Sequence, residues 1–132
     1  MLFCGENYTF MKAEIIHKQL HFKQPAGTSR GVYTTRNVWY IVLTDTQNPL
    51  LYGIGECAPL PALSCDDVPE YENVLKETCR QLEENAETVL ENLEDYPSIR
   101  FGVETALAHY RAQSLQLWNT PFSQGKEGIP IN

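Results

Sequence analysis

Residues 53–64 read GIGECAPLPALS, and this stretch decides how the rest of the chain is interpreted. Gly53 and Gly55 alternate inside an apolar run, LLYGIGE, which weakens a strand but lets another backbone segment approach closely. Pro59 and Pro61 then stiffen an apolar loop of a kind that a globular protein normally buries. The stretch predicts a strand that ends in a rigid loop, and this loop either fills the core or forms one wall of a site.

Two further strands are predicted upstream of this loop. In KAEIIHKQLHFK the alternation places Ile16, Leu20 and Phe22 on one face and directs His17 and His21 outward on the other. The run NVWYIVLTD is apolar and β-branched or aromatic almost throughout, so we expect it to be buried on both faces. Strands are therefore expected at residues 12–23, 35–45 and 50–56, as an antiparallel meander. Pro25, Gly27 and Gly31 predict an irregular loop at 24–36.

Downstream of the loop the period changes from two to 3.6 residues, which predicts helices over residues 69–93. Asp66 and Asp67 are expected to cap the first helix. One stripe is predicted to pack on the sheet, made of Tyr71, Val74, Leu75, Cys79 and Leu82. After Pro97, Ser98 can cap a further helix near residues 99–116, and IPIN at 129–132 reads as the opening of a strand. The fold class is therefore α+β.

Composition excludes several classes of partner. The net charge of −7 and the absence of a basic stripe argue against a nucleic-acid partner. No run approaches the ~20 apolar residues of a membrane span, and the first residues lack the features of a secretory signal, which argues against a membrane partner. The cysteines have no metal-binding spacing, so we expect free thiols and a cytoplasmic location. They are Cys4, Cys57, Cys65 and Cys79.

The sequence contains no catalytic constellation that can be identified from spacing alone. There is no GxSxG nucleophile motif and no glycine loop that leads into a helix to hold phosphate. His17 and His21 have no accompanying carboxylate or cysteine, so we interpret them as exposed strand residues and not as metal ligands. His109 is expected at a surface or an interface.

Taken together, these pieces resemble the amino-terminal capping domain of the enolase superfamily, and most closely that of the o-succinylbenzoate synthase family. The resemblance runs from about Met11 to the end of the chain. It is carried by Thr35 and Arg36, by GxGE-x-APLP-x-LS from Gly53 to Ser64, and by FGVETAL from Phe101 to Leu107. Muconate cycloisomerases and dipeptide epimerases look similar in this region.

The resemblance implies a cap followed by a modified (β/α) barrel that carries the chemistry. In that superfamily a Lys-x-Lys strand supplies a base, and three acidic residues hold Mg²⁺. The chain has neither motif, so we expect no catalytic and no metal residue in it. Residues 1–11 are interpreted as a possible extension, with Met11 as a possible native start. Residues 12–97 are interpreted as the cap and 98–132 as the truncated start of the barrel.

The resemblance also gives the loops a role. Cys57–Ser64 and Gly27–Val32 are expected to lie over the barrel mouth and to bind a small carboxylate substrate. The residues that this implies are Ser29, Arg30, Leu60, Pro61 and Leu63. Three alternatives stay open: Leu60 and Leu63 fill the core of the cap, Arg30 is simply solvated instead of meeting a carboxylate, or the chain is a free-standing binding module. We expect Glu56 to be a buried anchor of the loop, and the isolated chain to self-associate through exposed apolar groups.

Overall fold

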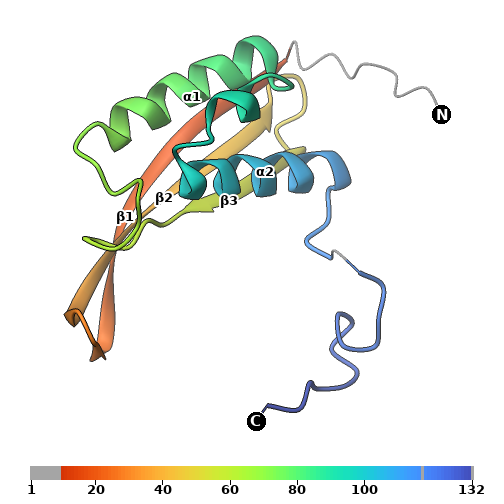
Figure 1. Ribbon diagram of the computed structural model, residues 1–132. Coiled ribbons are helices and arrows are strands. Elements are labelled where there is room, and N and C mark those ends of the chain that lie inside the picture. Colours follow the sequence, from red (N-terminus) through yellow and green to blue (C-terminus); the bar gives the residue numbers. More distant parts are fainter. Residues whose placement is uncertain (1–9, 117, 132) are drawn as a thin grey trace.

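The computed structural model describes residues 10–116 and 118–131. It contains one antiparallel sheet of order β1-β2-β3, followed by helices that lie over one face of the sheet (Figure 1). The fold is α+β, as the change of sequence period predicts. The strands are β1 (Met11–Thr28), β2 (Gly31–Asp45) and β3 (Tyr52–Cys57), and the helices are α1 (Tyr71–Asn85), the 3₁₀ helix η1 (Val89–Asn92) and α2 (Pro97–Ala112).

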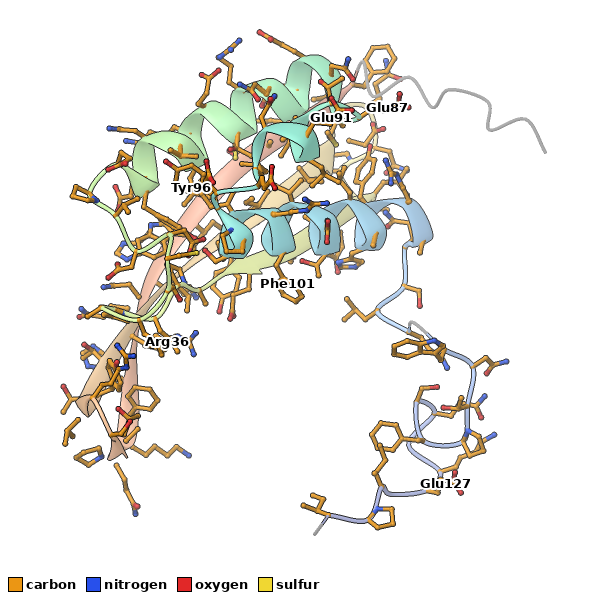
Figure 2. All side chains as sticks on the ribbon, in the orientation of Figure 1. Arg36, Glu87, Glu91, Tyr96, Phe101 and Glu127 are labelled. Atoms are coloured by element: carbon orange, nitrogen blue, oxygen red, sulfur yellow. The ribbon has the colours of Figure 1, made fainter. Side chains whose placement is uncertain are left out.

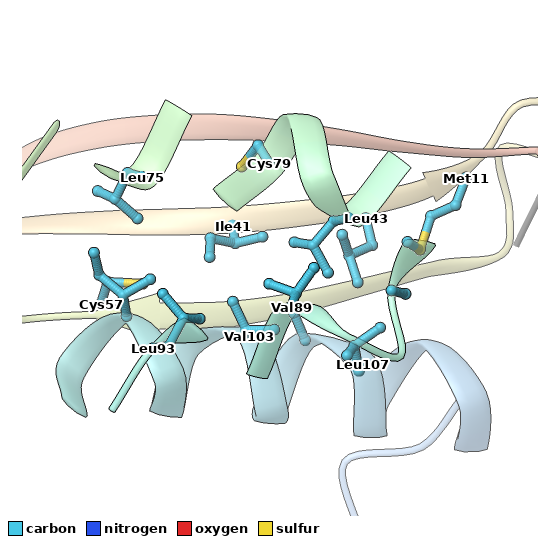
Figure 3. Packing of buried hydrophobic residues seen from close by; sticks show 14 of the residues in the cluster. Met11, Ile41, Leu43, Cys57, Leu75, Cys79, Val89, Leu93, Val103 and Leu107 are labelled. Carbon is cyan, nitrogen blue, oxygen red and sulfur yellow. The ribbon is translucent and has the colours of Figure 1, made fainter. Parts of the chain in front are cut away.

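The core lies between the sheet and both α-helices (Figure 3). Ile41 and Leu43 of β2 project into it and are fully buried. They meet the α1 stripe, in which Tyr71, Leu75, Cys79 and Leu82 are buried as predicted. Helix α2 contributes Ile99, Val103, Ala106 and Leu107 to the same core. Helix α2 and the sheet thus share one hydrophobic interior, and the division of the chain at residues 97 and 98 stays a prediction.

The glycines of β3 allow α2 to lie directly against the strand. A Cβ atom added to Gly53 would overlap the carbonyl oxygen of Ala106, and one added to Gly55 would overlap that of Gly102. A Cβ atom on Gly102 would in turn overlap the Cys57 sulfur. Close backbone approach at Gly53 and Gly55 was predicted from the sequence, and the segment that approaches is helix α2.

The face of β1 that packs on the core is opposite to the predicted one. Ala13 and Ile15 pack against the core cluster, whereas Ile16, Leu20 and Phe22 are 45%, 43% and 43% exposed. Both helices lie on the odd-numbered face, so the even-numbered face of the sheet is open. For the same reason β2 is not covered evenly on both sides: Val38 is buried on the open face, but Tyr40 and Val42 beside it are only half-buried.

The expected loop at 24–36 is instead a β-hairpin arm that extends beyond the helices (Figure 1). After a register shift between His21 and Ala26, the strands pair again up to Thr28 and Gly31. Pro25 lies within the shift and has no N–H to donate, which explains why the ladder is interrupted there. Pro25 therefore marks an irregularity inside a long hairpin and not its end.

Helix α2 ends earlier than predicted, at Ala112, where Gln113 adopts a left-handed conformation and its N–H donates to the His109 carbonyl at 2.8 Å. Residues 113–116 and 118–131 contain turns but no helix or strand, so the strand expected at Ile129 is not formed in the part that the structure describes. None of the described helices is long and apolar enough to cross a membrane.

Candidate functional site

A cavity of about 400 Å³ lies along the hairpin arm, between the arm and the loop that follows β3. Residues from two segments about 30 positions apart form its walls. All five predicted site residues line it: Ser29, Arg30, Leu60, Pro61 and Leu63. Five other lining residues were not foreseen: Phe22, Ala26, Thr28, Tyr33 and Arg36. The structure thus brings the two predicted loops together around one mostly apolar space.

The arm supplies one wall of the cavity through a tight turn. The Thr28 hydroxyl donates to the Gly31 carbonyl at 3.1 Å and accepts the Arg30 N–H at 3.2 Å. These two bonds fix the backbone of the turn at Ser29 and Arg30, as short side-chain bonds commonly do in turns. Both residues are exposed, so the side chain of Arg30 lies at the solvent edge of the cavity.

The loop after β3 supplies the other wall and is held by its own polar side chains. Ser64 Oγ accepts the Leu60 N–H at 2.8 Å, and Asp67 Oδ2 accepts the Ala62 N–H at 2.7 Å. Ala62 has a φ of 58°, which a residue with a side chain adopts only at some cost in energy. Two prolines and these bonds together hold the loop in one shape.

Two hydrogen bonds join the walls to each other. The Tyr33 hydroxyl donates to the Pro61 carbonyl at 3.3 Å, and Arg36 Nη2 donates to the Ala58 carbonyl at 2.7 Å. Figure 2 shows Arg36 where the arm leaves the body of the domain. Sequence reasoning used Arg36 only as a mark of the family. Its position directly before the apolar run at 37–45 is the sequence signal that the Arg36 side chain would be partly buried.

A buried carboxylate anchors the loop to helix α2. Asp66 is 1% exposed, and its Oδ2 accepts the Ser98 N–H at 2.8 Å and the Ser98 hydroxyl at 2.5 Å. Because Ser98 gives its hydroxyl hydrogen to Asp66, the Tyr71 hydroxyl donates to Ser98 Oγ, at 2.7 Å. Asp66 therefore caps α2 from a distant loop, and Asp67 closes the loop, whereas both were expected to cap α1.

Leu60 and Leu63 are not part of the buried core cluster, and Leu63 is 48% exposed. This placement disfavours the interpretation in which they fill the core of the cap. Glu56 is exposed on the open face of the sheet, so the expectation of a buried anchor is wrong. Burial first, and then the Glu56 carboxylate, raises the pKa of Tyr40 on the same face. Arg36, Ser64, Asp66 and Asp67 anchor the loop in its place.

The described residues offer no site for a metal ion: nowhere among them do three His, Cys, Asp or Glu side chains gather for one. His17 stacks on Trp39 with ring centroids 5.0 Å apart. Its side chain therefore lies on the face of the sheet that carries α1, and not on the open face. His109 is half-buried, and its Nδ1 accepts the Ile54 N–H at 3.1 Å. Magnesium therefore does not fit the residues described here.

The described cysteines are free thiols: Cys57 and Cys79 are buried, and Cys65 is exposed. Burial raises the pKa of both buried thiols to about 12, and in Cys57 the neighbouring Cys79 adds to the effect. Cys4 lies outside the described residues. The buried thiols are neutral at ordinary pH and do not act as nucleophiles there.

Comparison with known proteins identifies proteins that are similar to this domain in sequence and in fold. The chain is 27% identical over 160 residues to the o-succinylbenzoate synthase of Desulfotalea psychrophila (strain LSv54 / DSM 12343). The match covers 97% of the chain but 41% of that relative, so the chain spans well under half the relative's length. A solved o-succinylbenzoate synthase from Thermosynechococcus elongatus BP-1, with magnesium in its active site, is 27% identical with a TM-score of 0.57. That match covers 74% of the chain and 29% of the solved protein.

More distant structures share the fold alone. A mandelate racemase/muconate lactonizing protein from Herpetosiphon aurantiacus has a TM-score of 0.63 at 14% identity, over 80% of this chain and 32% of its own. A dipeptide epimerase from Enterococcus faecalis V583 has a TM-score of 0.62 at 14% identity, over 78% of this chain and 32% of its own. The sequence pattern of the MenC N-terminal domain matches residues 11–110, from the start of β1 to near the end of α2. The chain therefore belongs to the MenC N-terminal domain family.

Proposed function

We propose that this chain is the cap of a magnesium-dependent lyase of the o-succinylbenzoate synthase kind, and that its cavity shapes and closes the substrate site. The observation that carries the proposal is that two segments far apart in sequence, outside the core, are held together around one apolar cavity. A wall whose backbone is fixed by these bonds is suited to excluding water from a bound ligand.

The proposal assigns the chain a binding role and leaves the chemistry to a barrel that would follow it. Magnesium, when bound there, would stabilise negative charge that forms beside a substrate carboxylate. The residues of this chain would hold the apolar part of the substrate against Leu60 and Leu63 and keep water out. Because the bonds from Tyr33 and Arg36 fix both walls, the cap would present a preformed surface at low entropic cost.

The experiment is to express the chain together with the residues that follow it in its reading frame, and to assay dehydration to o-succinylbenzoate. Conversion that depends on magnesium supports the proposal. Racemisation, epimerisation or cycloisomerisation without dehydration would assign the parent to a relative within the superfamily. A stop codon directly after Asn132 would favour a free-standing binding module.

A pair of variants in that protein tests the role of the loop. Leu60→Ala should lower kcat with little loss of stability, because the smaller side chain lets water reach the substrate site. Leu75→Ala, in the buried stripe of α1, is the matched control. It should cost about 2–5 kcal/mol of stability and leave the kinetics of the folded protein unchanged. If Leu60→Ala behaves like Leu75→Ala, the loop is core and the proposal fails.

Two further expectations accompany this proposal. The isolated chain should self-associate through exposed apolar groups such as Leu63, Phe101 and Leu115, which are 48%, 60% and 79% exposed. Sedimentation that shows a clean monomer at high concentration would contradict this. The cytoplasmic location of the parent enzyme likewise stays a prediction.

A further inference from the structure

The Arg36 side chain has donors that the described residues leave unused. Its Nη2 donates to the Ala58 carbonyl at 2.7 Å, but its Nε is buried and has no hydrogen-bond partner among the described residues. Arg36 belongs to none of the ion pairs found in that part of the chain. It is half-buried and lines the cavity.

A guanidinium in this position is expected to bind an anion. It is always charged, and burying a charge without a counter-charge is costly. Its neighbours around the cavity are mainly apolar, among them Phe22, Tyr33, Leu60 and Leu63. The bond to Ala58 fixes the plane of the guanidinium, so its positive charge is presented to the cavity in one orientation.

Arg30 is the other cation of the cavity, and its surroundings differ. It lies at the tip of the hairpin and is exposed. A carboxylate bound there would remain in contact with water, where an ion pair gains little free energy. The same ligand group placed at Arg36 would be partly removed from water, where the attraction is stronger.

We propose that Arg36, and not Arg30, recognises the carboxylate of a small ligand whose apolar body fills the cavity beside Leu60 and Leu63. This inference rests on the proposed function, because it assumes that the cavity holds a ligand. Beyond the proposed function, it identifies Arg36 as the side chain that selects for a negatively charged ligand. In this role Arg36 acts both as a bridge between the two walls and as the anion-binding group.

The test compares two small probes that differ in charge and hardly in size, 3-phenylpropionate and 3-phenylpropanamide. Each is titrated into the 132-residue chain, and binding is followed by NMR through the backbone amides of Leu60 and Leu63. In the unsubstituted chain the acid should bind about 10-fold or more tightly than the amide, as a charge-assisted pair predicts. The Arg36 Nε–Hε signal should move with the acid and not with the amide.

Three variants then locate the selectivity. Arg36→Gln keeps a donor for the Ala58 carbonyl but removes the charge, and it should bring the ratio of the two dissociation constants to about one. Arg30→Gln should keep the preference for the acid. Lys18→Gln, a matched loss of one charge on β1 outside the cavity, should also keep it. Loss of the preference in Arg30→Gln, or its persistence in Arg36→Gln, would overturn the inference.

The remaining outcomes separate this inference from the proposed function. If both probes shift Leu60 and Leu63 with equal affinity, the cavity binds ligands but Arg36 does not select charge, and only the inference fails. If neither probe shifts them, the inference fails, and the dehydration assay of the longer protein decides the proposed function separately. Should Arg36→Gln not fold, the Nε–Hε signal of the unsubstituted chain decides, together with Arg36→Lys, which should retain part of the preference.

Discussion

Gly55 of β3 lies so close to Gly102 of α2 that a Cβ atom on Gly55 would overlap the Gly102 carbonyl oxygen. Gly102 is crowded by another residue of β3, since a Cβ atom on Gly102 would overlap the Cys57 sulfur. The Gly102 backbone at Gly55, and the Cys57 side chain at Gly102, therefore limit how close the sheet and the helix can lie.

Gly55→Ala should lower the free energy of unfolding by about 3 kcal/mol or more, at the upper end for overpacked sites, because a backbone cannot yield as a side chain can. Urea denaturation measures the change. Gly27→Ala is the matched control, since no atom lies within 4 Å of the Cβ it would add and Gly27 has an ordinary φ. Equal stability of the two variants would show that α2 does not pack on β3 this closely.

Asp66→Ala should destabilise the chain by about 1–3 kcal/mol, because the Ser98 N–H and hydroxyl lose a charged acceptor at the start of α2. Asp66→Asn keeps one acceptor oxygen and should cost less. Asp95→Ala is an exposed control and should have little effect. Urea unfolding curves measure the stability of each variant. An Asp66→Ala variant as stable as Asp95→Ala would show that Asp66 does not anchor the loop to α2.

The exposed ion pair between Glu77 and Arg80 on α1 predicts that the stability of the chain depends on pH. Hydrogen bonds from Arg80, and then from Gln81, lower the pKa of Glu77 to about 2. A carboxyl whose pKa is lower when folded contributes stability above its unfolded pKa of about 4.3 and loses it as the pH falls toward 2. Unsubstituted chain should therefore melt slightly above Glu77→Gln at pH 7, and the gap should close by pH 2. A gap that is unchanged at pH 2 would contradict this.

Thiol labelling tests the burial of the cysteines. At pH 8 a disulfide reagent should modify Cys65 rapidly, because it is exposed. Cys57 and Cys79 should react slowly, since burial raises the pKa of each to about 12 and leaves almost no thiolate. The measurement is best made in a Cys4→Ser background with denatured chain as the control. Rapid reaction of all three thiols would show that the core opens readily.

Features that depend on local periodicity could be predicted from the sequence. The stripe from Tyr71 to Leu82 is buried because a helix carries only one apolar face, and the spacing identifies it. The glycine alternation at Gly53 and Gly55 indicated close approach of another backbone. The two cavity walls were expected from the family resemblance, and the structure places their residues together.

Features that depend on tertiary contacts could not be predicted. Both faces of β1 carry apolar residues, Ile15 on one and Ile16 on the other, so alternation alone does not determine which face the helices cover. Asp66 was a reasonable cap for α1, but its true partner, Ser98, is 32 residues away. Pro25 was interpreted as the end of a strand, because a sequence does not show that pairing resumes beyond it.

The loop beside the cavity is held almost entirely through its main chain. The groups that Arg36, Ser64 and Asp67 contact are the Ala58 carbonyl and the Leu60 and Ala62 N–H groups. Main-chain atoms are the same whatever side chain they carry, so Leu60 or Leu63 can be exchanged without removing one of these bonds. Evolution, or an engineer, can thus vary the lining of this cavity while the loop keeps its shape, and new ligand preferences need not be accompanied by a loss of folding.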